Sequence, residues 1–447
     1  MIRKNELNKV DIVKRMAIFC SVFLLLVFMG CETLDFNDPN APTTENVGVQ
    51  NLVTGTEAGM RLEFQGYLRD VALVGREAYF FAAEDPRFST ILSGPLAAGG
   101  PFLNRPWNAR YRVVGNANFL LDLAAGFPSQ VGAGVAGFAK TIMAYQLLLN
   151  LNLTYNNGIK IEFSEDRNTP FVSKEEALAE IARLIDDGNS DLAAAGDAFS
   201  FILSSGFAGF NSPSGFSQFN RALRARVTAY VASESGSAQD WQTVLDVLED
   251  SFLDPAGDLN RGVYHIYGTG LGDELNPIFE SPTAAGIQFR GHPSFETDAE
   301  PDDNRFSSKV VVRPDLTEPV FDLVSTLAIN VSKSITDPFP IIRNEELILL
   351  RAEANIGLGN FAAADDDMNI VRNAAGLVGY GEPGGPPASD ASNALDHLLH
   401  ERRYSLFIEG HRWVDMRRYD RLDQLPLDRA GDVVIESQPR PVNELPD

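Results

Sequence analysis

Apolar residues recur at helical spacing along most of the chain. Within residues 104–125, large apolar side chains follow one another at steps of three to five: Trp107, Tyr111, Val114 and Phe119. Side chains at such steps lie on one face of a helix. The same spacing predicts helices over residues 46–83, 104–125, 131–152, 173–195, 216–233, 239–252, 344–357, 361–375 and 389–419.

Short polar turns join several of these predicted helices. Ser173 and Glu176 form a capping-box pattern at the start of one helix, and residues 357–360 make a Gly-rich turn between two others. A helical hairpin cannot bury its apolar face alone and needs a neighbouring hairpin. We therefore expect hairpins of residues 131–152 with 173–195, and of 216–233 with 239–252, although no strict 34-residue period relates them.

Residues 253–340 have a different pattern. Pro and Gly are frequent, and β-branched residues occur in short runs such as Lys309–Arg313. This stretch is predicted to be loops with a few short strands. The expected fold class is thus mainly all-α, with tetratricopeptide-like helical hairpins and long loops. Residues 46–447 are expected to form a single domain, in which 253–340 are a loop-rich insertion and 341–447 the carboxyl-terminal region.

The amino-terminal end has the pattern of an export signal. Five basic residues within positions 1–15 precede the uncharged run 16–29, which is about 21 Å long as a helix and short for a roughly 30 Å hydrocarbon core. The run ends at Gly30-Cys31, which is similar to a lipobox. We expect residues 1–30 to be a lipoprotein signal peptide, Cys31 the lipid anchor, and 31–45 an extended leader. An ordinary secretory signal with an incidental Cys31 is the alternative.

Composition narrows the possible partners. The 447 residues include 37 Lys and Arg against 61 Asp and Glu, a net charge of −24. Removing residues 1–30 leaves 32 basic and 59 acidic residues, a net charge of −27. Nucleic-acid binders show a basic surface, so nucleic acid is excluded as an expected partner. Cys20 and Cys31 are the two cysteines, so a thiolate metal cluster and a disulfide framework in the mature chain are excluded too.

Charged clusters in the second half of the chain suggest no catalytic site. Residues 401–418 combine carboxylates with five arginines, which keep acids ionised, whereas a general acid must hold its proton. His400-Glu401 lacks the second His of a metalloprotease helix, because Tyr404 stands there. The acidic loop 296–304 offers oxygen ligands for Ca²⁺ but lacks the EF-hand spacing, and a solvated loop is the simpler interpretation. We expect no cofactor.

Aromatic residues around positions 79–107 are the candidate ligand site. Rings offer flat apolar faces to sugars, and arginines offer planar donors; the selected residues are Phe81, Arg87, Phe88, Phe102 and Trp107. Their cluster is expected on a loop between helices, where binding residues concentrate. The alternative is that Phe80, Phe81 and Trp107 pack the core. A second cluster, within residues 199–216, is expected to line the ligand site or to contact a partner.

Three ordered motifs in the carboxyl third resemble one family. Residues 342–360 fit the pattern R-x-x-E-x-x-L-x-x-A-E-A followed by G-N, and residues 363–376 fit A-x-x-x-x-N-x-V-R-x-x-A-G. Residues 401–418 fit E-R-R-x-E-L-x-x-E-G-x-R-x-x-D-L-x-R, except that Ser405 stands where Glu is usual. Over about 75 residues the chain therefore resembles the SusD/RagB nutrient-uptake lipoproteins of the Bacteroidota type, with weaker echoes toward the amino end.

The resemblance implies a function and a location. It implies a non-catalytic outer-membrane lipoprotein at the cell surface, which binds a nutrient, commonly an oligosaccharide, and delivers it to a SusC-like TonB-dependent transporter. A secreted carbohydrate-active hydrolase and a helical-repeat interaction scaffold are the two alternatives. The sequence does not distinguish a glycan from a peptide as the ligand.

Overall fold

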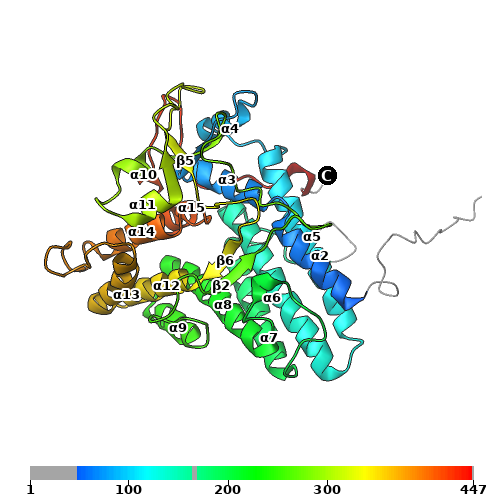
Figure 1. The fold of residues 1–447 in the computed structure, drawn as a ribbon. Helices are drawn as coiled ribbons and strands as arrows, with labels where there is room; N and C mark the ends of the chain where they lie inside the picture. The colour runs from blue at the N-terminus through cyan, green and yellow to red at the C-terminus, as the bar shows by residue number, and fades with distance from the viewer. Residues whose placement is uncertain (1–47, 164–168, 445–447) are drawn as a thin grey trace, which may run out of the picture. The chain divides into compact units, whose positions relative to one another are not determined.

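The computed structural model describes residues 48–163 and 169–444, which are mainly helical with six short strands (Figure 1). The helices are α2 (Val49–Arg61), α3 (Phe64–Val74), α4 (Arg87–Thr90), α5 (Pro101–Ala124), α6 (Ser129–Thr154), α7 (Lys174–Ala194), α8 (Pro213–Ser235), α9 (Ala238–Glu249), α10 (Ser294–Thr297), α11 (Asn304–Lys309), α12 (Asn344–Gly357), α13 (Phe361–Ala374), α14 (Ala394–Ser405) and α15 (Arg412–Arg418). The strands are β1 (Ala78–Phe80), β2 (Gly262–His265), β3 (Phe289–Gly291), β4 (Val310–Val312), β5 (Leu327–Ile329) and β6 (Phe339–Arg343). The predicted fold class is confirmed.

Consecutive helices pack against one another as hairpins. α5 contacts α6, α6 contacts α7, α7 contacts α8, and α8 contacts α9, while α12 packs on α9, α13 and α14. The hairpins predicted from residues 131–252 are therefore confirmed. The capping box also forms, because Ser173 Oγ accepts from the Glu176 amide at 3.2 Å and Glu176 Oε2 accepts from the Ser173 amide at 3.0 Å.

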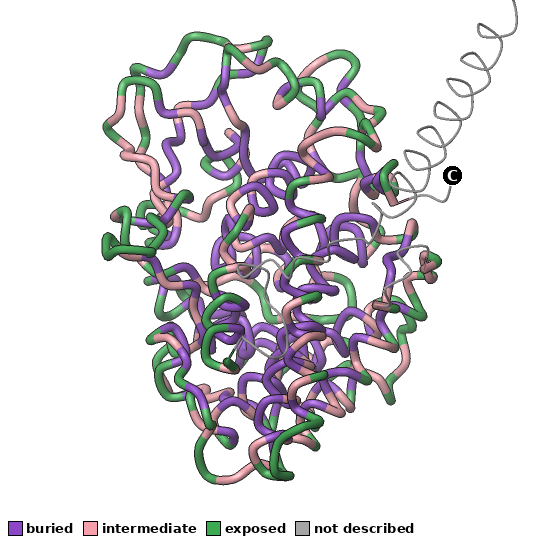
Figure 2. Tube along the Cα trace, turned by 90° about the vertical axis from the view of Figure 1, so that its right-hand side faces the viewer, coloured by how far each residue is buried: buried purple, intermediate pink, exposed green. Residues whose placement is uncertain are grey.

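Helix α6 is the centre of the helical body. Nearly all of its side chains from Gly137 onward are buried, and its neighbours α5 and α7 cover it on two sides. Among the residues described, Ser129–Asn157 is the segment apolar and long enough to span a membrane on length and composition alone, and 78% of its apolar window is buried in the protein. Figure 2 shows the buried segments running through the interior, with exposed positions mainly on the outer turns.

Two small antiparallel sheets lie in and beside the loop-rich insertion. One sheet has the strand order β1-β3-β5-β4, so Ala78 faces Gly291 and Val310 faces Ile329 in register. The other pairs β2 with β6 and has a register shift after Val263. The prediction of loops with a few short strands for 253–340 is confirmed. The structure also has two short helices in this stretch, α10 of four residues and α11 of six, which were not predicted.

Two predicted helices are interrupted in the structure. The helix predicted for 46–83 breaks at Glu63, whose φ is 55°. It resumes as α3, which ends at Val74, and the chain then continues into β1, which pairs with β3. The helix predicted for 389–419 divides into α14 and α15 around Ile408 and Gly410, whose φ values are 65° and 84°. A left-handed residue stops helical hydrogen bonding, so the chain turns there. The predicted signal peptide 1–30, the leader 31–45 and Cys31 lie outside the described residues.

Candidate functional site

Three phenylalanine rings from three different elements meet at the surface beside α4. Phe80 ends β1, Phe88 lies on α4, and Phe102 lies in the first turn of α5. The centroids of Phe80 and Phe88 are 4.5 Å apart, and those of Phe88 and Phe102 are 4.8 Å apart. All three side chains are only partly buried. We call Phe80, Phe88 and Phe102 the aromatic platform.

Two arginines accompany the aromatic platform. The Arg69 guanidinium carbon lies 4.6 Å from the Phe88 centroid, 5.4 Å from that of Phe80 and 5.6 Å from that of Phe102. Arg69 Nε donates to the fully buried Asp70 carboxylate at 3.2 Å. Burial raises the pKa of Asp70 to about 7, although Arg69 opposes the rise. Cation–π contact with three rings holds this guanidinium within the cluster.

Arg87 stands at the exposed rim of the aromatic platform. It donates to both carboxylate oxygens of Asp85, at 2.7 and 2.6 Å, and its guanidinium carbon is 5.8 Å from the Phe102 centroid. A cavity of about 140 Å³ opens next to it, and its wall includes Ile91, Leu96 and Phe102. Apolar walls with one planar charged donor at the rim suit the C–H faces and hydroxyl groups of a sugar ring.

The structure divides the predicted site residues into two groups. Arg87, Phe88 and Phe102 lie together at the surface, and their role as ligand contacts stays a prediction. Trp107 has no exposed surface and packs on Tyr111, with ring centroids 4.8 Å apart, so its selection as a ligand contact is corrected to a core role.

Phe81 is also a core residue, because alternation along the extended chain turns it away from Phe80. It is 6% exposed, and the Arg290 guanidinium carbon lies 4.4 Å from its ring centroid. The second predicted cluster, in residues 199–216, is mostly buried as well: Phe201 packs on Phe138, and Phe207 packs on Phe216. Phe210 of this cluster lines a cavity of about 720 Å³, so the expectation of a ligand-lining or partner-contacting role stays a prediction for that part of the cluster.

Sequence reasoning missed Arg69 and gave no role at the surface to Phe80. Arg69 lies on α3, eleven residues before Phe80 and outside the stretch dense in aromatic residues. Its local signal is a charged residue within an otherwise mostly buried helix. A charged side chain in such a helix indicates that an interaction partner packs against it, but the sequence does not identify that partner.

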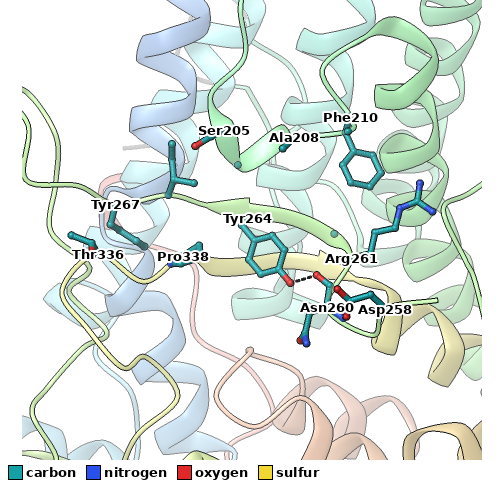
Figure 3. Close-up of a pocket in the computed structure, with 14 residues that line it drawn as sticks. Ser205, Ala208, Phe210, Asp258, Asn260, Arg261, Tyr264, Tyr267, Thr336 and Pro338 are labelled. Atoms are coloured by element: carbon teal, nitrogen blue, oxygen red, sulfur yellow. Dashed lines mark hydrogen bonds between the residues drawn. The ribbon is translucent and has the colours of Figure 1, made fainter. Parts of the chain in front are cut away.

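A larger cavity, of about 720 Å³, lies along β2 and away from the aromatic platform (Figure 3). Alternation along β2 sends Gly262 and Tyr264 to the cavity, while Val263 and His265 face the core. The Tyr264 hydroxyl donates to the Asn260 carbonyl oxygen, which holds the ring along the wall of the cavity. The predicted cluster of residues 199–216 contributes Phe210 to the wall of this cavity, whereas no sequence pattern indicated the part of the wall formed by β2.

The acids of the carboxyl-terminal motif are held in ion pairs inside the protein. Glu401 is fully buried and accepts hydrogen bonds from Arg305 at 2.6 Å, from Arg372 at 2.7 Å and from the Tyr380 hydroxyl at 2.8 Å. Burial acts to raise the pKa of Asp415, but Arg402 and Arg418 hold it below its ordinary value. The prediction that these acids are ion-paired and ionised is supported for Asp415.

The acidic loop 296–304 has its carboxylates directed to arginines. Asp298 pairs with Arg403 at 2.7 Å, and Glu300 pairs with Arg372 at 2.6 Å. Glu300, His400 and Glu401 come close enough to share a cation, but Arg372 donates to both of these glutamates. Arg372 therefore already supplies positive charge and donors to both carboxylates, which leaves less reason for these residues to bind Ca²⁺.

Comparisons with known proteins point to one family. Residues 321–440 match the model of the SusD family. Over 94 residues the chain is 37% identical to a SusD-like protein, P38, of Formosa agariphila, a match that spans 20% of this chain and 19% of that relative. The chain thus aligns with less than a fifth of this curated relative's length.

Solved structures share the fold over most of the chain. A laminarin-binding SusD-like protein superposes with a TM-score of 0.64 at 18% identity, covering 89% of this chain and 96% of that one. The surface glycan-binding protein A from Bacteroides uniformis gives a TM-score of 0.62 at 15% identity, covering 83% of this chain and 88% of the other. At these identities the likeness concerns the fold, and the resemblance predicted from the three sequence motifs is confirmed.

Proposed function

We propose that this chain, which has the SusD-superfamily fold and a carboxyl-terminal region matching the SusD family, is a non-catalytic glycan-binding protein of the cell surface. The observation that carries the proposal is the aromatic platform with its two arginines. Relatives of this fold include one named for binding laminarin and one named as a surface glycan-binding protein. A cluster of partly exposed rings is the feature that a pyranose needs.

Phe88→Ala is expected to weaken binding of laminarihexaose or a xyloglucan oligosaccharide by about 10- to 100-fold. Burying one aromatic side chain under a ligand contributes about 1.5–3 kcal/mol, which corresponds to that range. Isothermal titration calorimetry of the wild type and the variant measures the change. Phe127→Ala is the matched control, because Phe127 is an exposed ring following α5 and has no part in the aromatic platform. Equal affinities of wild type, Phe88→Ala and Phe102→Ala would place the glycan elsewhere.

Binding is favoured over hydrolysis by the placement of the acids. Among the described residues, burial raises the pKa of four carboxyl groups, and none of them lines the 140 Å³ cavity or the 720 Å³ cavity: Glu57, Asp70, Glu77 and Asp367. A general acid for glycoside cleavage has to reach the glycosidic oxygen with its proton. Release of reducing ends from the same oligosaccharides by the purified protein would favour the hydrolase alternative.

The proposal includes a lipid anchor at Cys31 and delivery of the glycan to a SusC-like TonB-dependent transporter in the outer membrane. Its support is the sequence pattern of residues 1–31 and the family match at 321–440. Cys31→Ala is expected to move the protein from the membrane fraction to the soluble fraction, because a cysteine is needed to carry the acyl chains. Fractionation followed by immunoblotting measures this. A variant that stays in the membrane fraction would contradict the anchor.

A further inference from the structure

Two cavities adjoin each other at Tyr264 and share part of their walls. The 720 Å³ cavity of Figure 3 and a second cavity of about 510 Å³ share Asn260, Tyr264 and Pro338 in their walls. Neither wall includes a residue of the aromatic platform. We call the two cavities together the Tyr264 groove. It is independent of the glycan site proposed above.

The 720 Å³ end of the Tyr264 groove suits an uncharged sugar ring. The Tyr264 ring is partly exposed along its wall, and the Arg261 guanidinium carbon lies 5.7 Å from the Phe210 centroid. Gly206 and Gly262 line the same end and leave the backbone free of side chains there. An aromatic wall, a planar donor and open backbone are the elements of a saccharide site.

The 510 Å³ end is lined by four cationic side chains and two carboxylates: Arg305, Lys309, Lys333, Arg343, Glu345 and Glu409. The two arginines are already neutralised. Arg343 pairs with Glu345 and, at 2.8 Å, with Glu409. Arg305 pairs with acids outside the cavity wall, Asp303 at 2.8 Å and Glu401 at 2.6 Å. The lysines are therefore the groups that distinguish this end.

Both lysines donate to backbone carbonyl oxygens. Lys309 Nζ donates to the carbonyl oxygens of Tyr404, at 2.8 Å, and Ser405, which are the last carbonyls of α14. Lys333 Nζ donates to the Asn330 carbonyl oxygen at 2.6 Å and to that of Ser308. Within residues 48–163 and 169–444, neither ammonium forms a salt bridge. An ammonium carries three donors, so each lysine retains one.

The surroundings of Lys309 favour a bound anion. Burial lowers the pKa of Lys309 to about 7, with Glu409 opposing the change and Arg343 adding to it. An anion in the adjoining cavity supplies the missing counter-charge and accepts the free donors. Capping of the α14 carbonyls explains two hydrogen bonds of Lys309. It does not explain why Lys333, which has Asp337 near it but forms no salt bridge among the described residues, lines the same cavity.

We propose that the Tyr264 groove binds an acidic oligosaccharide, with a sugar ring against Tyr264 and an anionic substituent, a carboxylate or a sulfate ester, at Lys309 and Lys333. The ligand class follows from the two ends of the groove taken together. One end is aromatic and carries one carboxylate, Asp258, against one guanidinium, Arg261; the other end has a net positive charge and free donors.

Calorimetry with tetragalacturonate and with its methyl ester tests the proposal, because the ester keeps the sugar and removes the charge. Tetragalacturonate is expected to bind, and the affinity of the ester is expected to be lower by about tenfold or more. Lys333→Met is expected to weaken binding of the acid about tenfold without affecting the ester. A sulfated galactan tetrasaccharide is titrated in the same way. If it binds and Lys333→Met weakens its binding, while tetragalacturonate does not bind, the substituent is a sulfate ester.

Lys140→Met is the matched control for net charge, since Lys140 pairs with Asp191 between α6 and α7. It is expected to leave affinity unchanged, as is Phe88→Ala, which reports on the aromatic platform alone. Lys309→Met is a further variant, at a partly buried position. If it unfolds, Lys333→Met, at an exposed position, still tests the proposal. The proposal is overturned if neither anionic oligosaccharide binds, or if Lys333→Met binds both as the wild type does.

Discussion

Glu401→Gln is expected to lower the free energy of unfolding by about 3–5 kcal/mol. The glutamate has no exposed surface and neutralises two buried arginines, Arg305 and Arg372, while its remaining acceptor capacity takes the Tyr380 hydroxyl. The amide keeps the shape but removes the charge. Arg305 keeps Asp303 and Arg372 keeps Glu300, but each loses its fully buried counter-ion, and the new amide group turns its own donors toward theirs. Breaking a buried ion pair costs about that amount. Urea denaturation followed by circular dichroism measures the difference.

Asp396→Asn on the same helix is the control for Glu401→Gln. Asp396 pairs with Arg421 at 2.8 Å, but its side chain is 60% exposed. Exposed ion pairs contribute about 0–1 kcal/mol, so this substitution is expected to change stability by no more than that. A loss below about 1 kcal/mol in Glu401→Gln, equal to the control, would mean that the motif does not stabilise the fold through its charge.

Glu77→Gln is expected to remove a pH dependence of stability worth about 3 kcal/mol. Burial raises the pKa of Glu77 from 4.5 to about 7, with the Ile408 amide opposing the rise, and its Oε1 has no hydrogen-bond partner among the described residues. The folded state therefore binds the proton more tightly than the unfolded state does. This contribution to stability is complete below pH 4.5 and is lost as the pH rises through about 7.

Unfolding midpoints between pH 4.5 and pH 8 measure the contribution of Glu77. Glu77→Gln is expected to match the wild type near pH 4.5 and to exceed it by about 3 kcal/mol at pH 8. Glu318→Gln, at an exposed position, is the control and is expected to follow the wild-type curve. Parallel curves for wild type and Glu77→Gln over this pH range would contradict the raised pKa.

Helices whose signals are local were predicted closely. The spacing of apolar residues predicted 344–357, which are the residues of α12, and Ser173 with Glu176 predicted the start of α7. The break between α14 and α15 was not predicted. It places left-handed backbone at Ile408, a β-branched residue whose sequence gives no turn signal. Its side chain is fully buried in a cluster with Phe295 and Phe407, so tertiary packing selects that conformation.

The contacts of Ser405, the residue that departs from the motif, are visible only in the tertiary structure. Sequence comparison identifies a serine where the family usually has Glu. In the structure, the Ser405 hydroxyl lies 3.1 Å from Arg305 Nη1, and its carbonyl oxygen accepts from Lys309 and Arg343. A carboxylate here would bring a charge near both Arg305 and Lys309. The side chain at position 405 therefore contacts Arg305, while Lys309 contacts only the backbone of this residue.

The sequence by itself determined the helical hairpins, the family resemblance and three of the surface residues of the candidate site, Arg87, Phe88 and Phe102. Those features depend on neighbours within a few turns of helix or on short motifs, which a sequence displays directly. Only the tertiary structure decided that Trp107 and Phe81 are core residues and that Arg69 joins the aromatic platform. Burial and cation–π contact depend on which distant segments pack together, and spacing along one segment does not specify its partner.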